Sequence, residues 1–164
     1  MNWLDIVIVL ALVFFALTGL AHGLIVELFQ IGGIILGVIL AGRYYSQLEP
    51  WLSFLGNANG VRIFSFIIIF VVVLMIAYAI GSLLKEAFSL LLLGPLDHLL
   101  GLIFGFIKGA LVIQLVLIAF AKFPLFDMGL TLADSRLAPY FLNNFPVLLN
   151  ILPADFEAVK RFFK

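Results

Sequence analysis

The longest uncharged stretch of the chain limits its fold more than any other feature of the sequence. It covers residues 63–84, where Tyr78 is the only ionisable side chain. A helix of this length rises about 33 Å at 1.5 Å per residue, which is enough to cross the hydrocarbon core of a bilayer. A backbone in lipid must satisfy its own hydrogen bonds, as a continuous helix does. We therefore predict a transmembrane helix here.

Composition extends this interpretation to the whole chain, since 65% of its 164 residues are hydrophobic and 11% are charged. A soluble domain of this size cannot bury so much apolar surface. The apolar runs are continuous and do not alternate, which disfavours a transmembrane barrel. We expect an all-α, polytopic membrane protein that forms one domain over residues 1–164, with four transmembrane helices at about residues 4–20, 26–42, 63–84 and 99–121.

The first two apolar runs are short for a bilayer. The uncharged residues 6–20 and 28–42 would each form a helix of roughly 22 Å, against a hydrocarbon core of about 30 Å. Three solutions are open: the helices extend through His22 and Glu27, the bilayer thins locally, or the pair forms a hairpin that does not fully cross. We favour two complete spans joined by a tight turn near residues 19–23.

Several classes of function find no support in the residues present. The chain has no cysteine and a formal net charge of zero, so it offers neither a thiolate nor a basic face for nucleic acid. Its two histidines, His22 and His98, lack carboxylates or cysteines at the spacing of a metal site. No nucleophile elbow surrounds a serine. We expect no metal, no cofactor, no nucleic-acid partner and no enzymatic activity.

Glycine recurs at every fourth residue in the last apolar run, at Gly101, Gly105 and Gly109. This spacing places the glycines along one face of a helix, where another backbone can approach closely. Gly33 and Gly37 give the second run a similar face of small residues. We favour helix packing within one chain. A self-association face and a conduction path lined by glycine backbone are the alternatives.

Four charged side chains border or interrupt the apolar runs, namely Asp5, Glu27, Asp97 and Lys108. Charges at membrane depth are costly and normally face protein or water, so these are the candidate functional residues. We expect Asp97 to be an N-cap or first-turn acid of its helix; the alternative is an ion pair or a proton-carrying role, with Lys108 of another helix or with His98. Lys108 is expected to reach the membrane surface or to pair with Glu27 or Asp5; otherwise it lines a polar cavity.

Two segments have features typical of the membrane surface. Residues 46–62 are typical of a loop in which residues 51–55 lie on the surface. The tail, residues 123–164, is expected to be amphipathic and interfacial, because charged residues alternate with apolar ones and Phe156, Val159 and Phe163 recur at helical spacing. Lys and Arg concentrate in these two segments, which by the positive-inside rule places both termini in the cytoplasm.

Four short motifs resemble those of the colicin V production protein (CvpA) family, and together they extend over almost the whole chain. They are NWLD at residues 2–5, GLIVE at 23–27, LDHLLGLIFGFIKG at 96–109 and SRLAP at 135–139. The resemblance implies a multi-pass protein of the bacterial inner membrane with four spans, linked to colicin V production. It implies no molecular mechanism.

The sequence departs from the family at three of these positions. The family commonly has arginine where His22 and His98 stand, and often where Lys108 stands. If those arginines bind an anionic group, this chain would bind the same group more weakly, because histidine is largely neutral at pH 7.

Two functional hypotheses remain. The first is an accessory protein of the inner membrane that supports toxin export or envelope homeostasis, with the lipid bilayer, further copies of itself and other envelope proteins as partners. The second is an oligomeric small channel or transporter with a polar path along Asp97, Lys108 and Gln114. Reconstituted protein that conducts no ions or small solutes would count against the second.

Overall fold

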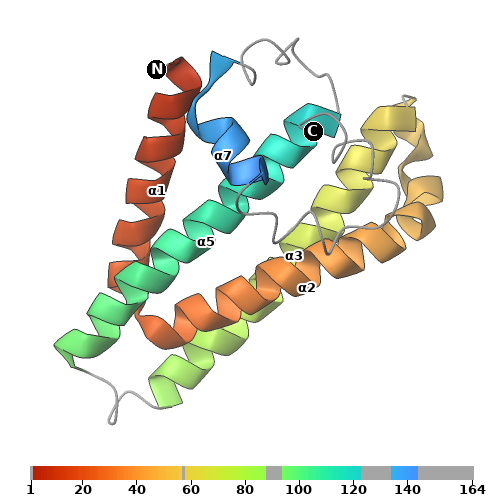
Figure 1. Cartoon of the computed structure of the whole chain (residues 1–164). Helices are drawn as coiled ribbons and strands as arrows, with labels where there is room; N and C mark the ends of the chain where they lie inside the picture. The colour runs from red at the N-terminus through yellow and green to blue at the C-terminus, as the bar shows by residue number, and fades with distance from the viewer. Residues whose placement is uncertain (1, 57, 88–93, 123–133, 144–164) are drawn as a thin grey trace.

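The computed structural model describes residues 2–56, 58–87, 94–122 and 134–143. Every element in these ranges is helical, and Figure 1 shows their arrangement. In chain order the elements are α1 (Trp3–His22), α2 (Leu24–Leu48), the 3-10 helix η1 (Glu49–Leu55), α3 (Ala58–Ala87), α5 (Pro95–Lys122) and α7 (Leu137–Asn143).

Four of the described helices are long and apolar enough to cross a bilayer, which confirms the expected fold class. They begin at Trp3, Leu24, Gly60 and Pro95. Only 6% of the most apolar window of α3 is buried inside the protein, whereas half of the corresponding window of α5 is buried. In a bilayer, α3 therefore presents most of its surface to lipid, and α5 is the central helix.

The helices alternate in direction, and α1 and α2 diverge from their shared junction (Figure 1). Helix α5 packs against α1 on one side and α2 on the other, while α3 packs against α2. The hydrophobic core is built from apolar side chains of α1, α2, α5 and α7. The junction thus lies at one end of the bundle, and η1 lies at the other.

The first two runs reach spanning length because their helices extend through His22 and Glu27, the first of the three open solutions. Helix α1 ends at His22 and α2 begins at Leu24, so the turn is the single residue Gly23. Gly23 has a φ of +80°, a backbone conformation that is unfavourable for residues other than glycine. At its other end α2 continues to Leu48, and α3 begins at Ala58. The loop predicted at residues 46–62 is therefore shorter, and most of it forms η1.

The glycine repeat of α5 packs against α1 within the chain. A Cβ atom on Gly105 would lie 2.8 Å from Gly19 Cα, and one on Gly109 would lie 2.8 Å from Phe15 Cβ. A Cβ on Gly101 would lie 2.7 Å from Gly23 Cα. These separations are too short for real carbon atoms, so the close contact between α1 and α5 requires the absence of side chains.

The small residues of α2 serve a second contact of the same kind. A Cβ atom on Gly37 would lie 2.8 Å from Cδ2 of Phe70, and one on Gly33 would press on the methyl group of Ala77. Phe70 and Ala77 both belong to α3. Glycines therefore set the separation between α1 and α5 and between α2 and α3.

Part of the tail packs against the helical bundle. Helix α7 contacts α5 and α1, and its residues Ala138, Phe141 and Leu142 are buried in the core. Gln114 of α5 donates from Nε2 to the carbonyl oxygen of Phe141 at 3.2 Å. One face of residues 137–143 therefore packs inside the protein, while Tyr140 remains exposed. Tail residues 123–133 and 144–164, including Phe156, lie outside the described ranges, so the interfacial tail stays a prediction.

Candidate functional site

The junction between α1 and α2 is stabilised by an acid from another helix. The Leu24 backbone N–H donates to Asp97 Oδ1 at 2.9 Å, so Asp97 of α5 caps the N-terminus of α2. As expected, Asp97 lies in the first turn of its own helix, but the N-terminus that its side chain caps is that of α2. Backbone N–H groups in the first turn of a helix have no partner within the helix, and the helix dipole favours a negative charge there. Gly23 permits this contact, because a Cβ atom on it would overlap the Asp97 carboxylate.

The other half of the junction is the C-terminus of α1, where the last backbone carbonyls have no hydrogen-bond donor within their own helix. Lys85 of α3 donates from Nζ to the carbonyl oxygen of His22 at 2.6 Å. His98 of α5 lies with Nδ1 2.7 Å from the carbonyl oxygen of Leu20. Basic side chains suit this end of a helix dipole, as the acid suits the start of α2. Side chains from α3 and α5 therefore fix the angle between α1 and α2.

A buried ion pair lies one turn beyond the junction. Lys108 Nζ is 2.7 Å from Glu27 Oε2 and 2.8 Å from Glu27 Oε1, and it also donates to Gln30 Oε1 at 2.7 Å. The Glu27 side chain is fully buried and that of Lys108 is 6% exposed. Of the three donors of the ammonium group, one is accepted by Glu27 Oε1 and one by the amide oxygen of Gln30. Glu27 and Asp5 are the two acids predicted as ion-pair partners of Lys108, and the structure shows that Lys108 pairs with Glu27.

Two aromatic contacts surround this pair. The Lys108 ammonium lies 5.6 Å from the ring centroid of Phe15, where the ring face attracts a cation. His22 lies with Nδ1 3.4 Å from Glu27 Oε1, and its ring packs edge-on against Tyr78 with centroids 5.8 Å apart. The His22 side chain is 37% exposed, so it lies between the buried carboxylate and the protein surface. We call His22, Glu27, Gln30 and Lys108 the junction cluster.

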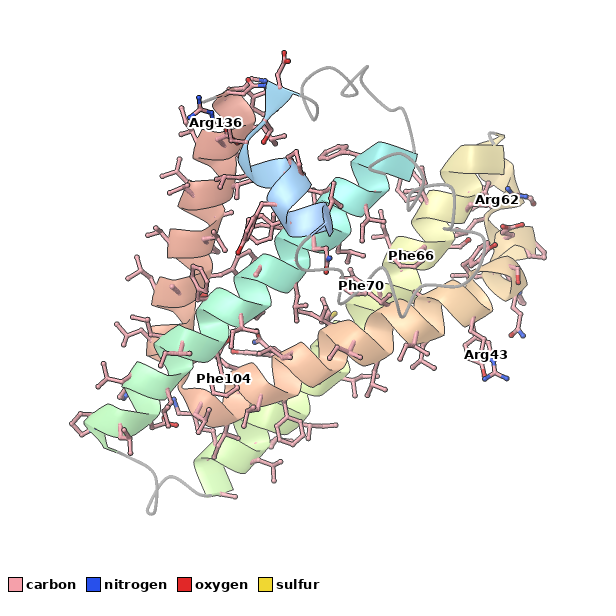
Figure 2. The ribbon with its side chains drawn as sticks, viewed as in Figure 1. Arg43, Arg62, Phe66, Phe70, Phe104 and Arg136 are labelled. Atoms are coloured by element: carbon pink, nitrogen blue, oxygen red, sulfur yellow. The ribbon has the colours of Figure 1, made fainter. Side chains whose placement is uncertain are left out.

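Asp5 performs a similar task at the opposite end of α1. Its Oδ1 accepts hydrogen bonds from Ser135 Oγ at 2.6 Å and from the backbone N–H groups of Arg136 and Leu137 at 3.0 Å. Ser135 Oγ in turn accepts from the Ala138 N–H at 3.0 Å, which caps α7. Figure 2 places Arg136 beside the start of α1 and far from Arg43 and Arg62. Asp5 therefore ties α7 to α1.

The charged residues that the sequence singles out thus act between elements. Residues 2–5 contact residues 135–139 through Asp5, and residues 23–27 contact residues 96–109 through Asp97 and Lys108. Among the described residues, no group of three or more His, Cys, Asp or Glu side chains could hold a metal ion. The arrangement holds helices together, and His22 is an ionisable group that lies between the buried Glu27–Lys108 pair and the protein surface.

Sequence reasoning missed three participants, which are Gln30, Lys85 and Ser135. Gln30 follows Glu27 by three residues, so the two share a helix face, and that spacing was an available signal. Ser135 precedes α7 as a typical capping residue does. Lys85 follows the cleanest apolar run, and nothing local to it indicates a carbonyl of α1 as its partner.

Comparisons with known proteins find similarity over most of the chain. A family model described as Colicin V production protein matches residues 4–146. A Haemophilus influenzae relative named Colicin V production protein homolog is 26% identical over 141 residues, covering 84% of this chain and 85% of the relative. The Escherichia coli Colicin V production protein is 26% identical over 145 residues, covering 86% and 87% respectively. No solved structure matches. The chain is a multi-pass membrane protein and belongs to the colicin V production protein family.

Proposed function

We propose that this protein acts in the bacterial inner membrane as an accessory protein for colicin V production, toxin export and envelope homeostasis. The observation that carries the proposal is the family match over residues 4–146, together with the names of the two relatives. Spanning helices, rather than a barrel, suit the inner membrane. We expect other envelope proteins to be its partners.

The geometry favours an accessory role over catalysis or conduction. Asp97 accepts from the start of α2, and Lys108 is bonded to Glu27 and Gln30, so these groups stabilise the fold. The glycine face of α5 is covered by α1, so a homo-oligomer that used this face would have to displace α1. We therefore expect partners to bind surfaces other than the glycine face.

One observation favours the second candidate, an oligomeric small channel or transporter. The Glu27–Lys108 pair is buried within helices of spanning length, and His22 connects it to the surface. Ionisable groups at membrane depth commonly mark ion or proton pathways. Flux through reconstituted protein tests this candidate: a solute leak that disappears in the double variant Glu27→Met/Lys108→Met, which removes both charges without leaving one unpaired, would support it, and the absence of any leak from the wild-type protein would contradict it.

Complementation tests the accessory role. A strain of Escherichia coli that lacks its own colicin V production protein and carries colicin V genes should regain toxin release when this chain is expressed. Release is measured as the zone of killing on a sensitive lawn, with the Escherichia coli protein as positive control. If the chain accumulates in the inner membrane as well as that protein does and release stays absent, the proposed function is wrong.

A further inference from the structure

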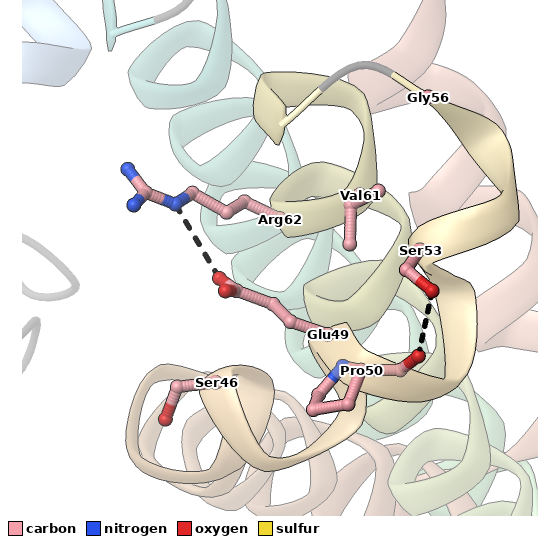
Figure 3. A pocket seen from close by; sticks show the side chains of 7 residues that line it. All are labelled: Ser46, Glu49, Pro50, Ser53, Gly56, Val61 and Arg62. Atoms are coloured by element: carbon pink, nitrogen blue, oxygen red, sulfur yellow. Dashed lines mark hydrogen bonds and ion pairs between the residues drawn. The ribbon is translucent and has the colours of Figure 1, made fainter.

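A cavity of about 450 Å³ lies between the end of α2, η1 and the start of α3 (Figure 3). Its volume falls within the range of small-molecule sites, about 300–1,000 Å³. Its walls carry two opposite charges, Glu49 and Arg62, and two hydroxyl groups, Ser46 and Ser53. The cavity is at the opposite end of α2 from the junction cluster, and the contacts described above do not involve it.

The charged walls have unused capacity to bind a ligand. Arg62 Nε lies 3.4 Å from Glu49 Oε1, and the side chains are 57% and 30% exposed. A guanidinium group has five N–H donors, so this long contact leaves most of them available. Figure 3 shows the two terminal nitrogens of Arg62 pointing away from Glu49. The cavity therefore offers a cation and an anion side by side, each able to accept a further partner.

The surroundings of the cavity place it at the membrane surface. On η1, the side chains of Trp51 and Phe54 are 81% and 78% exposed. Helix η1 follows α2 at the end of the second candidate span, which reaches Phe54, and large aromatic residues concentrate at the boundary between lipid headgroups and acyl chains. A short helix with such side chains lies in the plane of this boundary. The adjacent cavity is thus at the depth of the headgroups.

We propose that this cavity binds the headgroup of a zwitterionic phospholipid with a primary amine, as in phosphatidylethanolamine. Arg62 binds the phosphodiester, because guanidinium groups form charge-assisted hydrogen bonds with phosphate oxygens. Glu49 accepts from the ammonium group. Trp51 and Phe54 anchor η1 in the same lipid layer, so the lipid's acyl chains continue into the bilayer beside them.

The same two side chains predict selectivity among headgroups. A phosphatidylglycerol headgroup has no cation to neutralise Glu49, whose negative charge repels the phosphate. A phosphatidylcholine headgroup has a cation without N–H donors, so it cannot form a charge-assisted hydrogen bond with the carboxylate. Each such bond is worth about a factor of ten in affinity. The site should therefore prefer the primary amine over both.

Lipid competition tests the proposal on the whole chain. The purified protein is incubated in detergent with equal amounts of phosphatidylethanolamine, phosphatidylglycerol and phosphatidylcholine of identical acyl chains, and retained lipids are counted by native mass spectrometry. We expect phosphatidylethanolamine to be retained about tenfold over each of the others. Equal retention of the three lipids by the wild-type protein would overturn the proposal, whatever the variants do.

Three variants then locate the site. Arg62→Gln should lower phosphatidylethanolamine retention about tenfold, and Glu49→Gln should abolish the preference over phosphatidylglycerol. Arg43→Gln is the matched control, because Arg43 is an exposed cation of α2 near the same end, stacked on Tyr44 and outside the cavity. If Arg43→Gln lowers retention as much as Arg62→Gln does, binding is a general effect of basic charge and the assignment is wrong.

A soluble competitor distinguishes a membrane lipid from a free metabolite of the same chemistry. Glycerophosphoethanolamine carries the same phosphodiester and ammonium but no acyl chains. It should displace the lipid at concentrations at least tenfold above those of the lipid itself, since it lacks the contacts of the acyl chains with the apolar surface near η1. Displacement at equal concentration would mean that the cavity binds a soluble ligand and would overturn the lipid assignment.

Discussion

An acid lies at each end of helix α2, Glu27 in its first turn and Glu49 directly after it at the start of η1, and the two resulting ion pairs differ in distance, burial and surroundings. Glu27 and Lys108 are buried 2.7 Å apart among hydrogen bonds from several helices. Glu49 and Arg62 are partly exposed 3.4 Å apart beside a cavity. A buried pair is costly to break, whereas an exposed pair is worth little to stability. The first end of α2 therefore fixes the fold, and the second end is available for a ligand.

Breaking the buried pair should have the largest effect. Lys108→Met removes the cation and leaves the Glu27 carboxylate without its partner in a low dielectric, which costs about 3–5 kcal/mol. We expect the variant to accumulate poorly in membranes and to unfold at a lower denaturant concentration. Quantitative immunoblotting of the membrane fraction and unfolding in sodium dodecyl sulfate, followed by circular dichroism, measure both effects.

The double variant Glu27→Met/Lys108→Met is the control for this prediction. It removes both charges together, and replacing a buried pair with apolar side chains of similar volume is often neutral or stabilising. The double variant should therefore accumulate better than Lys108→Met alone. If it is as unstable as the single variant, packing rather than the unpaired charge explains the loss.

The glycine contact between α1 and α5 should give the next largest effect. Gly105→Leu forces the two helices apart, because even a Cβ atom there would lie 2.8 Å from Gly19 Cα. Overpacking of this kind costs about 1–3 kcal/mol, occasionally more. Gly32→Leu is the matched control, since no atom lies within 4 Å of a Cβ placed on Gly32. Equal stability of the two variants would contradict the packing argument.

The cap that Asp97 forms on α2 should have a smaller effect. Asp97→Ala leaves the Leu24 N–H without its acceptor, at a cost of about 0.5–2 kcal/mol. Asp97→Asn keeps an acceptor oxygen and should lose less. Glu86→Ala removes an exposed acid near the same end of the bundle and should change little. Unfolding midpoints of the three variants in detergent check this order, and a Glu86→Ala effect equal to that of Asp97→Ala would contradict it.

These contacts show which features of the protein could be predicted from its sequence. The four spans, the glycine face and the identity of the charged residues follow from local patterns: uninterrupted apolar runs, a four-residue spacing and charges at membrane depth. The partners do not follow, because they join distant residues. Lys108 binds an acid 81 positions away, and Ser135 binds an acid 130 positions away.

Asp97 shows why local rules do not reveal which helix a side chain caps. Its position in the first turn of α5 is typical of an acid that stabilises its own helix. Its backbone N–H already donates to the Gly94 carbonyl, and Pro95 has no N–H that needs a cap. The side chain is therefore available to accept from α2. That contact depends on the approach of Gly23 to α5, which the sequence does not reveal. The burial of α7 was not predicted for a related reason, since its apolar side chains pack against α1 and α5, which are distant in the sequence.

The smallest expected effect on stability belongs to the exposed pair. Arg62→Gln removes a contact between side chains that are 57% and 30% exposed, so the free energy of unfolding should fall by less than about 1 kcal/mol. The same variant should lose lipid retention, which separates binding from folding at this end of α2. The free energy of unfolding in detergent is measured for Arg62→Gln, for the control Arg43→Gln and for the wild-type protein. If Arg62→Gln destabilises the protein as much as Lys108→Met does, the Glu49–Arg62 pair also stabilises the fold, and the proposed contrast between the two ends of α2 is wrong.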